Sequence, residues 1–556
     1  MKITQNPVGY LDAVHDGEKY LRENFVRTSK YDEILNPNCL YISGRKGDGT
    51  SVIALMLMKE KDKNGELLYK YEVLIRNYEF YHSIAVDLRE ASLSRVAGYE
   101  SPIKDRINME YYFQKLWEYV IYVSAMRGVI EKNSGEGLIL INDFLENNNF
   151  PAVGERNFFD CFLDIFGKDL EILYKKEDDL FFPVATSLTR RVNDRLNDPN
   201  FIGALKTLRN HISKNNRVLI VIDTIEKYYV NEEEFQKAVQ GMMQAVYEIK
   251  HNNKNRWIDI KCFIPDELYE DFAAWNLYKV TDSTVFLEWK YKELLHLICK
   301  RYMTYLKKNY SYQEIKEYET KWNNLDKNSR DSIRCFLNEF FPETIKSRFG
   351  ANEDCFNYIL RHTQNKPRQV IHLVNNIINC AEANGRAPKI SQEDVYEGVH
   401  RDMDQLIGVA FMAFSHQYRE LLQYIKRMFH GQENILRGRV VRECIKKGGS
   451  TYVKMGLDAE DVERILLRSG LVGIVSKQTK MSLPSGKEIG VYHTLFEYLT
   501  RGHLEMTDES LCAVHPMLTG YYGNNMAIRE NSYVVPYGGL YYEGEDDNLI
   551  TKKNRK

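Results

Sequence analysis

Hydrophobic residues in this chain gather in short runs that alternate with longer amphipathic stretches. Strand-like apolar runs lie at 39–42, 217–223, 258–264 and 284–289. Apolar positions at helical spacing lie at 109–126, 232–250 and 290–306. A short aliphatic run between polar turns is typical of a parallel strand covered on both faces. The alternation predicts a doubly wound α/β domain with a mainly parallel sheet, whose ligands bind at the carboxyl ends of the strands.

The second half of the chain changes character. Helical patterns dominate from about 290 to 400, and three further short helices are predicted between 415 and 470. Two β-rich runs follow, joined by a turn that contains Pro484 and Gly486. Three helices followed by a β-hairpin is the order of elements in a winged helix.

These patterns predict five successive parts. The first is an amphipathic lead-in helix, because Tyr20, Leu21 and Phe25 fall near helical spacing. The last is a tail that is extended or loosely attached. The predicted boundaries are a helical lead-in at 1–35, an α/β domain at 36–290, a helical lid at 291–400, a winged-helix-like domain at 401–522 and the tail at 523–556.

Length and composition are those of a folded, soluble protein. The 556 residues are 44% hydrophobic and 28% charged, and the net charge of −2 provides no overall basic field for nucleic acid. The nine cysteines are scattered without a C-x-x-C pair, so we expect small buried hydrophobes in a reducing cytosol, not disulfides or zinc ligands. Neither a secretory signal nor an apolar run of about 20 residues is evident. The sequence predicts a cytoplasmic protein without membrane contact.

The first apolar run leads into a glycine-rich turn. The spacing from Gly44 to Ser51 matches G-x-x-x-x-G-K-[ST], except that Thr50 stands where the lysine belongs. A strand, a glycine loop and a helix start together form an anion cradle of backbone amides. The residues predicted to bind nucleotide are Gly44, Arg45, Lys46, Gly47, Asp48, Gly49, Thr50 and Ser51.

Two acids follow the second aliphatic run. Asp223 ends that run, where a Walker B carboxylate belongs, and Glu226 lies three residues further on. With the Ser51 hydroxyl, Asp223 would ligate Mg²⁺, and Glu226 would polarise water or complete the metal shell. These residues predict ATP or ADP with Mg²⁺ as the cofactor. An aspartate at this place is also common as a simple turn cap, and both interpretations stay open.

Thr50 changes what the loop can do. A charge-assisted hydrogen bond contributes about 1.5–3 kcal/mol, so its loss would weaken ATP binding about ten- to hundred-fold. Arg45 or Lys46 could fold back to compensate, or both could point into solvent. The backbone cradle does not depend on residue 50. We therefore expect nucleotide binding with weak or absent hydrolysis, in a weak ATPase or a pseudo-ATPase.

Two further segments carry candidate cations. Pro367 and Arg368 begin an amphipathic helix, from which Arg368 would reach a γ-phosphate or form a salt bridge within its own domain. The segment 437–447 contains five cations and one acid, Glu443. Such a stripe predicts DNA contact through residues 437–475, although runs of this kind are also common on solvated helix faces.

The motifs together resemble the bacterial P-loop ATPases of the STAND and AAA-like class, whose loop reads G-x-K-G-x-G-K-[ST]. The resemblance spans about residues 10–522 and rests on the segments 44–51, 218–226, 261–272, 286–302, 362–377 and 513–518. It implies phosphate and magnesium binding by Gly44, Gly47, Gly49 and Ser51, a Walker B role for Asp223, a second acid at Glu226 and a sensor-like arginine at Arg368. The sequence departs from this family pattern at Thr50 and at Pro265, which replaces an arginine.

The resemblance implies a function. Many members of the class are encoded beside antiphage defence genes, so the expected function is a nucleotide-dependent switch or assembly subunit in bacterial defence. Its partner would be another protein or further copies of the chain. A separate hypothesis is a purely structural oligomerisation protein, in which surfaces rich in the 38 tyrosines mediate assembly. The alternative is a pseudo-ATPase scaffold that binds DNA or a protein through its winged helix.

Overall fold

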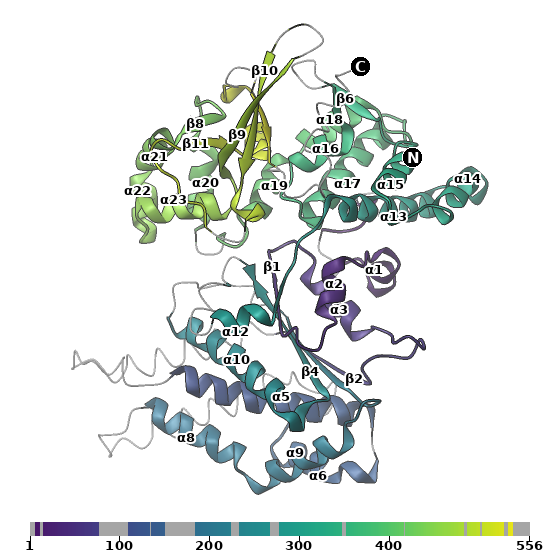
Figure 1. The fold of residues 1–556 in the computed structure, drawn as a ribbon, viewed down its shortest axis with the longest axis vertical. Helices are drawn as coiled ribbons and strands as arrows, with labels where there is room; N and C mark the ends of the chain where they lie inside the picture. The colour runs from purple at the N-terminus through teal and green to yellow at the C-terminus, as the bar shows by residue number, and fades with distance from the viewer. Residues whose placement is uncertain are drawn as a thin grey trace. The chain divides into compact units, whose positions relative to one another are not determined.

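The computed structural model divides the chain into two units. We call Ser29–Arg45 with Thr50–Leu287 the α/β unit, and Met1–Thr28, Lys46–Gly49 and Glu288–Lys556 the C-terminal unit. Each unit is described by itself below and drawn in Figure 1. The structure describes residues 6–11, 15–76, 109–133, 135–150, 184–223, 233–266, 269, 277–346, 352–415, 418–482, 486, 488–500, 503–527 and 532–536.

The α/β unit is built on a five-stranded sheet in the order β2-β3-β4-β1-β5. Every pairing in it is parallel, which confirms the predicted parallel sheet. Aliphatic side chains on both faces of β3 are buried, as the unbroken run Val218–Ile222 predicted. The strands are β1 (Tyr41–Gly44), β2 (Tyr71–Arg76), β3 (Val218–Asp223), β4 (Ile258–Pro265) and β5 (Thr284–Phe286).

Helices cover both faces of this sheet. Figure 1 shows α3 on one face and the long helices α5 and α10 on the other. The apolar pattern of α5 predicted burial, and Trp117, Val120 and Ile121 are fully buried. The helices are α2 (Ser29–Ile34), α3 (Thr50–Met58), α5 (Met109–Lys132), α6 (Ile139–Asn147), α8 (Val184–Leu196), α9 (Pro199–His211), α10 (Glu233–His251) and α12 (Leu277–Asp282), with 3₁₀ turns at Glu136–Leu138 and Asn253–Asn255.

The C-terminal unit is mainly helical, with a large apolar core and two smaller apolar clusters around its sheet. That core includes the buried faces of α13 and α17, which contribute Leu294, Tyr302 and Leu373. The helices are α1 (Glu18–Asn24), α13 (Tyr291–Asn309), α14 (Tyr312–Asn323), α15 (Arg330–Leu337), α16 (Cys355–Arg361), α17 (Pro367–Ala383), α18 (Gln392–His400), α19 (Met403–Ala410), α20 (Arg419–Met428), α21 (Gly438–Lys446), α22 (Gly449–Tyr452), α23 (Ala459–Arg468) and α24 (Pro516–Tyr522), with 3₁₀ turns at Val453–Met455, Glu497–Leu499 and Gly523–Asn525.

A second five-stranded sheet, in the order β12-β10-β9-β11-β8, belongs to this unit. The antiparallel hairpin β9–β10 follows α20, α21 and α23, as the sequence predicted. Part of the predicted loose tail is an ordered strand, since β12 pairs with β10 and buries Tyr533 and Val534. The strands are β6 (Thr344–Lys346), β7 (Asn352–Asp354), β8 (Ile435–Arg437), β9 (Val472–Ser482), β10 (Glu488–Leu495), β11 (Leu511–Val514) and β12 (Tyr533–Val535).

The prediction of one lead-in helix over residues 1–35 is wrong. The chain forms two short helices, α1 and α2, and leaves the helical conformation at Phe25, whose φ and ψ are −67° and 129°. The Phe25 carbonyl accepts a hydrogen bond from Lys300 Nζ (2.6 Å) in place of a helical amide. A tertiary contact therefore ends the first helix where the apolar spacing alone predicts continuation.

Candidate functional site

The predicted strand, loop and helix start are present. β1 is buried throughout and ends at Gly44, and α3 begins at Thr50. A Cβ atom on Gly44 would lie 2.7 Å from Leu287 Cδ1, so any larger residue here would require the Leu287 side chain to move. Thr50 and Ser51 are half-buried in the first turn of α3, whose free amides make it a suitable end for an anion.

The topology places a crevice beside this loop. From β1 the chain crosses to β2 at one edge of the sheet, and from the neighbouring strand β4 it crosses to β5 at the other edge. Connections that leave adjacent strands in opposite directions define the switch point where open α/β sheets bind ligands. The register sets Gly44 opposite Pro265 at this point. The candidate site thus lies at the carboxyl ends of β1 and β4.

Asp266, which the sequence analysis did not identify, lies at this switch point. Its carboxylate accepts hydrogen bonds from Ser43 Oγ (3.0 Å) and Arg45 Nε (3.1 Å). The interpretation in which Arg45 points into solvent is therefore wrong, since only 14% of its side chain is exposed. The charge of Arg45 is offset by an acid that follows a different strand.

Asp223 lies at the carboxyl end of β3, next to β4 in the sheet. Its side chain is 2% exposed. Burial, and then the negative charge of Asp223, raise the pKa of the Cys262 thiol on β4. The buried carboxylate of Asp223 thus lies at the same end of the parallel sheet as the carboxyl end of β1. Glu226 lies outside the described residues.

The middle of the loop, Lys46–Gly49, makes its contacts in the C-terminal unit. The Gly47 carbonyl accepts a hydrogen bond from the Arg368 amide (3.3 Å), and the Asp48 carbonyl accepts one from Trp289 Nε1 (2.9 Å). Gly47 has a φ of 103°, which L side chains rarely adopt. Two hydrogen bonds to loop carbonyls, one from a backbone amide and one from an indole, therefore hold the loop in a conformation that favours glycine.

Arg368 lies in the first turn of α17, as predicted. Its Nε donates to the Leu11 carbonyl (3.1 Å), and Nη1 is 3.6 Å from Met412 Sδ. The guanidinium group is thus bonded within its own unit, to a carbonyl and a sulfur and not through the salt bridge considered above. Its predicted reach to a γ-phosphate stays a prediction.

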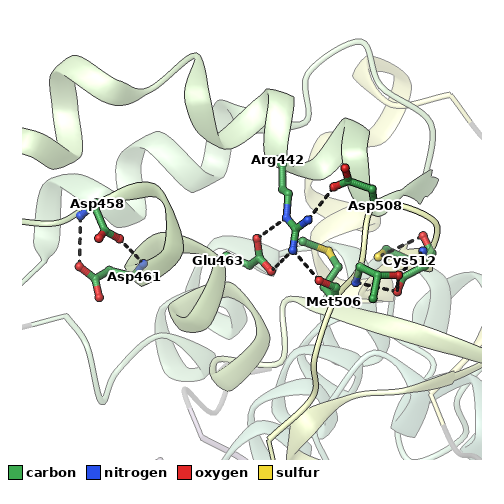
Figure 2. Close-up of polar contacts among 9 residues, drawn as sticks. Arg442, Asp458, Asp461, Glu463, Met506, Asp508 and Cys512 are labelled. Carbon is green, nitrogen blue, oxygen red and sulfur yellow. Dashed lines mark hydrogen bonds and ion pairs between the residues drawn. The ribbon is translucent and has the colours of Figure 1, made fainter.

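The predicted basic segment 437–447 lies on α21 beside acids from elsewhere in the chain. Arg442 donates from Nε to Glu463 (2.8 Å) and from Nη1 to Asp508 (2.6 Å), as Figure 2 shows. Its Nη2 also donates to the Met506 carbonyl (2.5 Å). The central cation of the predicted DNA stripe is therefore neutralised by two carboxylates.

A groove of about 660 Å³ borders this ion-pair cluster. Its cations alternate with acids, and Ile445, Leu467 and Met506 contribute apolar surface. A lining of both signs does not provide the uniformly positive surface that a phosphate backbone needs. The charged residues along it are Arg442, Lys446, Arg464, Arg468, Glu460, Glu463 and Glu505.

Two other predictions concern the chain as a whole. Each cysteine in the described ranges is a free thiol, and all of these except Cys335 are buried, as expected of small hydrophobes. In the part of the chain that the structure describes, no helix has both the length and the apolar character needed to cross a membrane.

Comparison with known proteins gives one family match. The model of the FunZ-associated C-terminal helical domain matches residues 319–401, a minor part of the chain that contains α15, α16, α17 and α18. No curated protein matches the chain.

Solved structures of the Aeropyrum pernix ORC2 protein show a weak likeness. The ADPNP–ADP complexes are 11% identical with a TM-score of 0.32, over 88% of this chain and 90% of that chain. The ADP form is 11% identical with a TM-score of 0.27, over 88% and 87%. TM-scores of this size do not establish a common fold and assign no function to this chain.

Proposed function

We propose that this chain is a nucleotide-binding P-loop protein of the STAND/AAA-like type, a regulatory switch or assembly subunit that takes ATP or ADP with Mg²⁺. The proposal rests on one observation, that the strand β1, the glycine-rich loop and the helix α3 follow one another beside the switch point between β1 and β4. A glycine loop and helix-start amides at such a crevice suit a polyphosphate. A setting in bacterial defence rests on the sequence resemblance alone.

The donor groups at this edge of the sheet suit the proposed ligands. Mg²⁺ prefers oxygen ligands and usually takes one or two carboxylates with substrate phosphates. Asp223, a buried carboxylate, and the Ser51 hydroxyl would supply oxygens, and the amides of the loop and α3 would bind phosphate. In the proposal Glu226 positions water and Arg368 responds to the γ-phosphate.

Weak hydrolysis follows from Thr50. Phosphoryl transfer depends mainly on positioned charge, and the loop ammonium is one of those charges. The pair between Arg45 and Asp266 supports this, because that arginine is engaged by an acid at the switch point. The proposed protein therefore binds and senses nucleotide more effectively than it hydrolyses it.

Coupling to the rest of the protein would run through the loop. Gly47 is hydrogen-bonded to the first turn of α17 through Arg368. A phosphate bound by the amides of Lys46–Gly49 would change the position of this segment and thereby the equilibrium of α17. A protein partner or further copies of the chain would recognise the changed conformation.

Isothermal titration with ATP and ADP, with and without Mg²⁺, tests the proposal. We expect a Kd below about 1 mM for both nucleotides, tightened by Mg²⁺. Asp223→Asn should remove the Mg²⁺ dependence. Asp198→Asn in the same unit is the matched control, because Asp198 caps α9 and asparagine caps a helix equally well. Absence of binding by either nucleotide at millimolar concentration would refute the proposal.

The second candidate is a pseudo-ATPase scaffold that binds DNA or a protein through a winged-helix-like domain. The order α20, α21, α23 and β9–β10 favours such a domain, and the mixed charges along the groove favour a protein over DNA. Mobility-shift titrations at several salt concentrations distinguish these partners. DNA binding through phosphates would weaken steeply as salt rises.

A further inference from the structure

Three lysines and a histidine gather on one side of α13. Lys292, His296 and Lys300 are spaced four residues apart, so they lie along one face of this helix at intervals of about 6 Å. The loop after α14 contributes Lys327, whose Nζ lies 4.7 Å from the centre of the Trp322 ring. The centres of the Trp322 and His296 rings lie 6.0 Å apart. We call the three lysines and His296 the α13 cluster, and all of it belongs to the C-terminal unit.

The positive charges of the α13 cluster repel one another. Burial, and then the charges of the three lysines, lower the pKa of His296 to about 4. Burial, and then the charge of Lys327, also lower the pKa of Lys300. Like charges held close together destabilise a fold unless an opposite charge offsets them. The cluster is therefore a place where a bound anion would stabilise the protein.

The α13 cluster is not neutralised by acids of the protein. Among the residues that the structure describes, no carboxylate forms an ion pair with any of its four side chains. The adjacent acids in sequence, Glu293 and Asp326, accept hydrogen bonds from the backbone amides of Lys290 (2.9 Å) and Asn328 (2.9 Å). In the segment 437–447, by contrast, two carboxylates neutralise the central cation. The cluster thus keeps its charge available to a ligand.

We propose that the α13 cluster binds the phosphates of duplex DNA. Duplex DNA carries about one negative charge per 1.7 Å of its axis, and lysines that contact its phosphates release bound counterions. This interaction needs accessible charge of one sign, and Lys327 is exposed. The inference does not depend on nucleotide binding at the glycine-rich loop. It also places DNA on a different surface from the predicted residues 437–475.

The surroundings of the α13 cluster suit duplex DNA better than two other polyanions. Single-stranded nucleic acids are usually held by exposed aromatic rings on which their bases stack. A specific interface with an acidic protein has an apolar centre. Trp322, the aromatic residue beside His296, is only 8% exposed. The phosphates of a duplex require neither feature, so they fit the cluster best.

Fluorescence anisotropy with the full chain and a labelled duplex of about 20 base pairs tests the inference. Titrations between about 50 and 200 mM salt give the slope of log K against log salt, which becomes more negative by about 0.9 for each phosphate contact. Lys292→Gln combined with Lys327→Gln should weaken binding at least about tenfold and make this slope shallower by about 2. A duplex of a second sequence should show the same loss, since phosphates carry no sequence information.

Lys308→Gln is the matched control for Lys327→Gln, because each removes one exposed positive charge. Lys308 lies in the last turn of α13, about 12 Å along the helix axis from Lys300. Its loss should change DNA affinity by less than about twofold. An equal loss of affinity in the two variants would show that net charge, and not the cluster, determines binding, and would overturn the inference.

Lys300 is kept in every variant, because its bond to the Phe25 carbonyl is part of the fold. Thermal melts check that each variant is folded, and Lys327→Glu should weaken binding more than Lys327→Gln. The inference is wrong if the folded variants bind the duplex as the natural chain does. It is also wrong if the natural chain binds no duplex at about 50 mM salt, or binds only single-stranded RNA or poly-glutamate. None of these results affects the nucleotide site, which the calorimetric titrations test separately.

Discussion

The glycine-rich loop and the basic segment 437–447 differ in the number of cations that their local sequences contain. The basic segment is rich in cations, yet Arg442 is held by Glu463 and Asp508. The loop lacks its usual lysine, yet Lys366 packs against Gly47. The region with more cations in sequence therefore has its central one neutralised, and the stem of a buried lysine from another segment packs on the deficient region.

This difference shows that the number of cations in a segment does not measure the charge available to a ligand. Exposed ion pairs are screened by water, and each contributes about 0–1 kcal/mol. A buried, restricted ammonium group interacts more strongly with an anion, because the local dielectric constant is lower. The position of a cation in the fold therefore matters more for a ligand than the number of cations in a segment.

The largest expected effect comes from completing the loop. Thr50→Lys should raise the rate of phosphate release about hundred-fold, because the ammonium group would stabilise charge on the transferred phosphoryl group. The measurement is a phosphate-release assay beside the natural chain, with Asp223→Asn added as a background that should abolish the gain. An unchanged rate would mean that the site lacks more than its lysine.

The next effect concerns two buried histidines that the fold keeps neutral. Burial lowers the pKa of His515 to about 3 and lowers the pKa of His362 well below its usual range. Above pH 6.5 the two histidines are neutral in both the folded and the unfolded chain, so they do not make the stability depend on pH. Below about pH 6.5 the unfolded chain binds protons that the folded chain excludes, so each histidine should cost about 1.4 kcal/mol per pH unit.

Denaturant unfolding between pH 7.5 and 5.5 measures this loss of stability. His515 Nδ1 accepts a hydrogen bond from the Met517 amide (3.2 Å) and thereby caps α24. His515→Asn retains a side-chain acceptor without the titratable ring, so it should remove the share of the pH dependence that comes from His515, about 1.4 kcal/mol per pH unit below pH 6.5. An equal pH dependence in this variant would assign the effect to other groups.

A smaller effect is expected in the basic segment. Arg442→Met should lower the free energy of unfolding by about 1 kcal/mol, since its side chain is 36% exposed and the ion pairs are screened. DNA affinity and its salt dependence should not change. The control is Lys446→Met on the same helix, an exposed lysine of the groove. A greater loss of DNA binding for Arg442→Met than for the control would show that Arg442 contacts DNA.

The smallest effect is expected at the switch point. Asp266→Asn removes a negative charge beside the end of β1 and releases Arg45 from its ion pair, so ATP affinity should rise about threefold. Asp282→Asn, an exposed acid on α12, should leave the affinity unchanged. Both are measured by titration calorimetry. Weaker binding in Asp266→Asn would indicate that this carboxylate helps the ligand.

Periodicity along the chain was sufficient to predict β1, β3, β4 and β5 and the long helices α5, α10 and α13. The aliphatic runs at 217–223 and 258–264 became β3 and β4 within one residue at an end, and the glycine-rich turn lies between β1 and α3. A short segment of sequence shows which positions are apolar and how they are spaced, and this spacing indicates a strand or a helix. The candidate loop residues Gly44–Ser51 could be identified for the same reason.

The sequence by itself therefore determined the central strands, the long helices and the glycine loop of this protein, but not the break between α1 and α2 or the pairing of β12. Only the tertiary structure decided that Asp266 pairs with Arg45, that Glu463 and Asp508 neutralise Arg442, and that Lys366 packs on Gly47. Each of these contacts joins residues far apart along the chain, from elements whose order in space is set by strand pairing and core packing. A pattern of apolar and polar positions does not predict which side chains from distant parts of the sequence will be in contact.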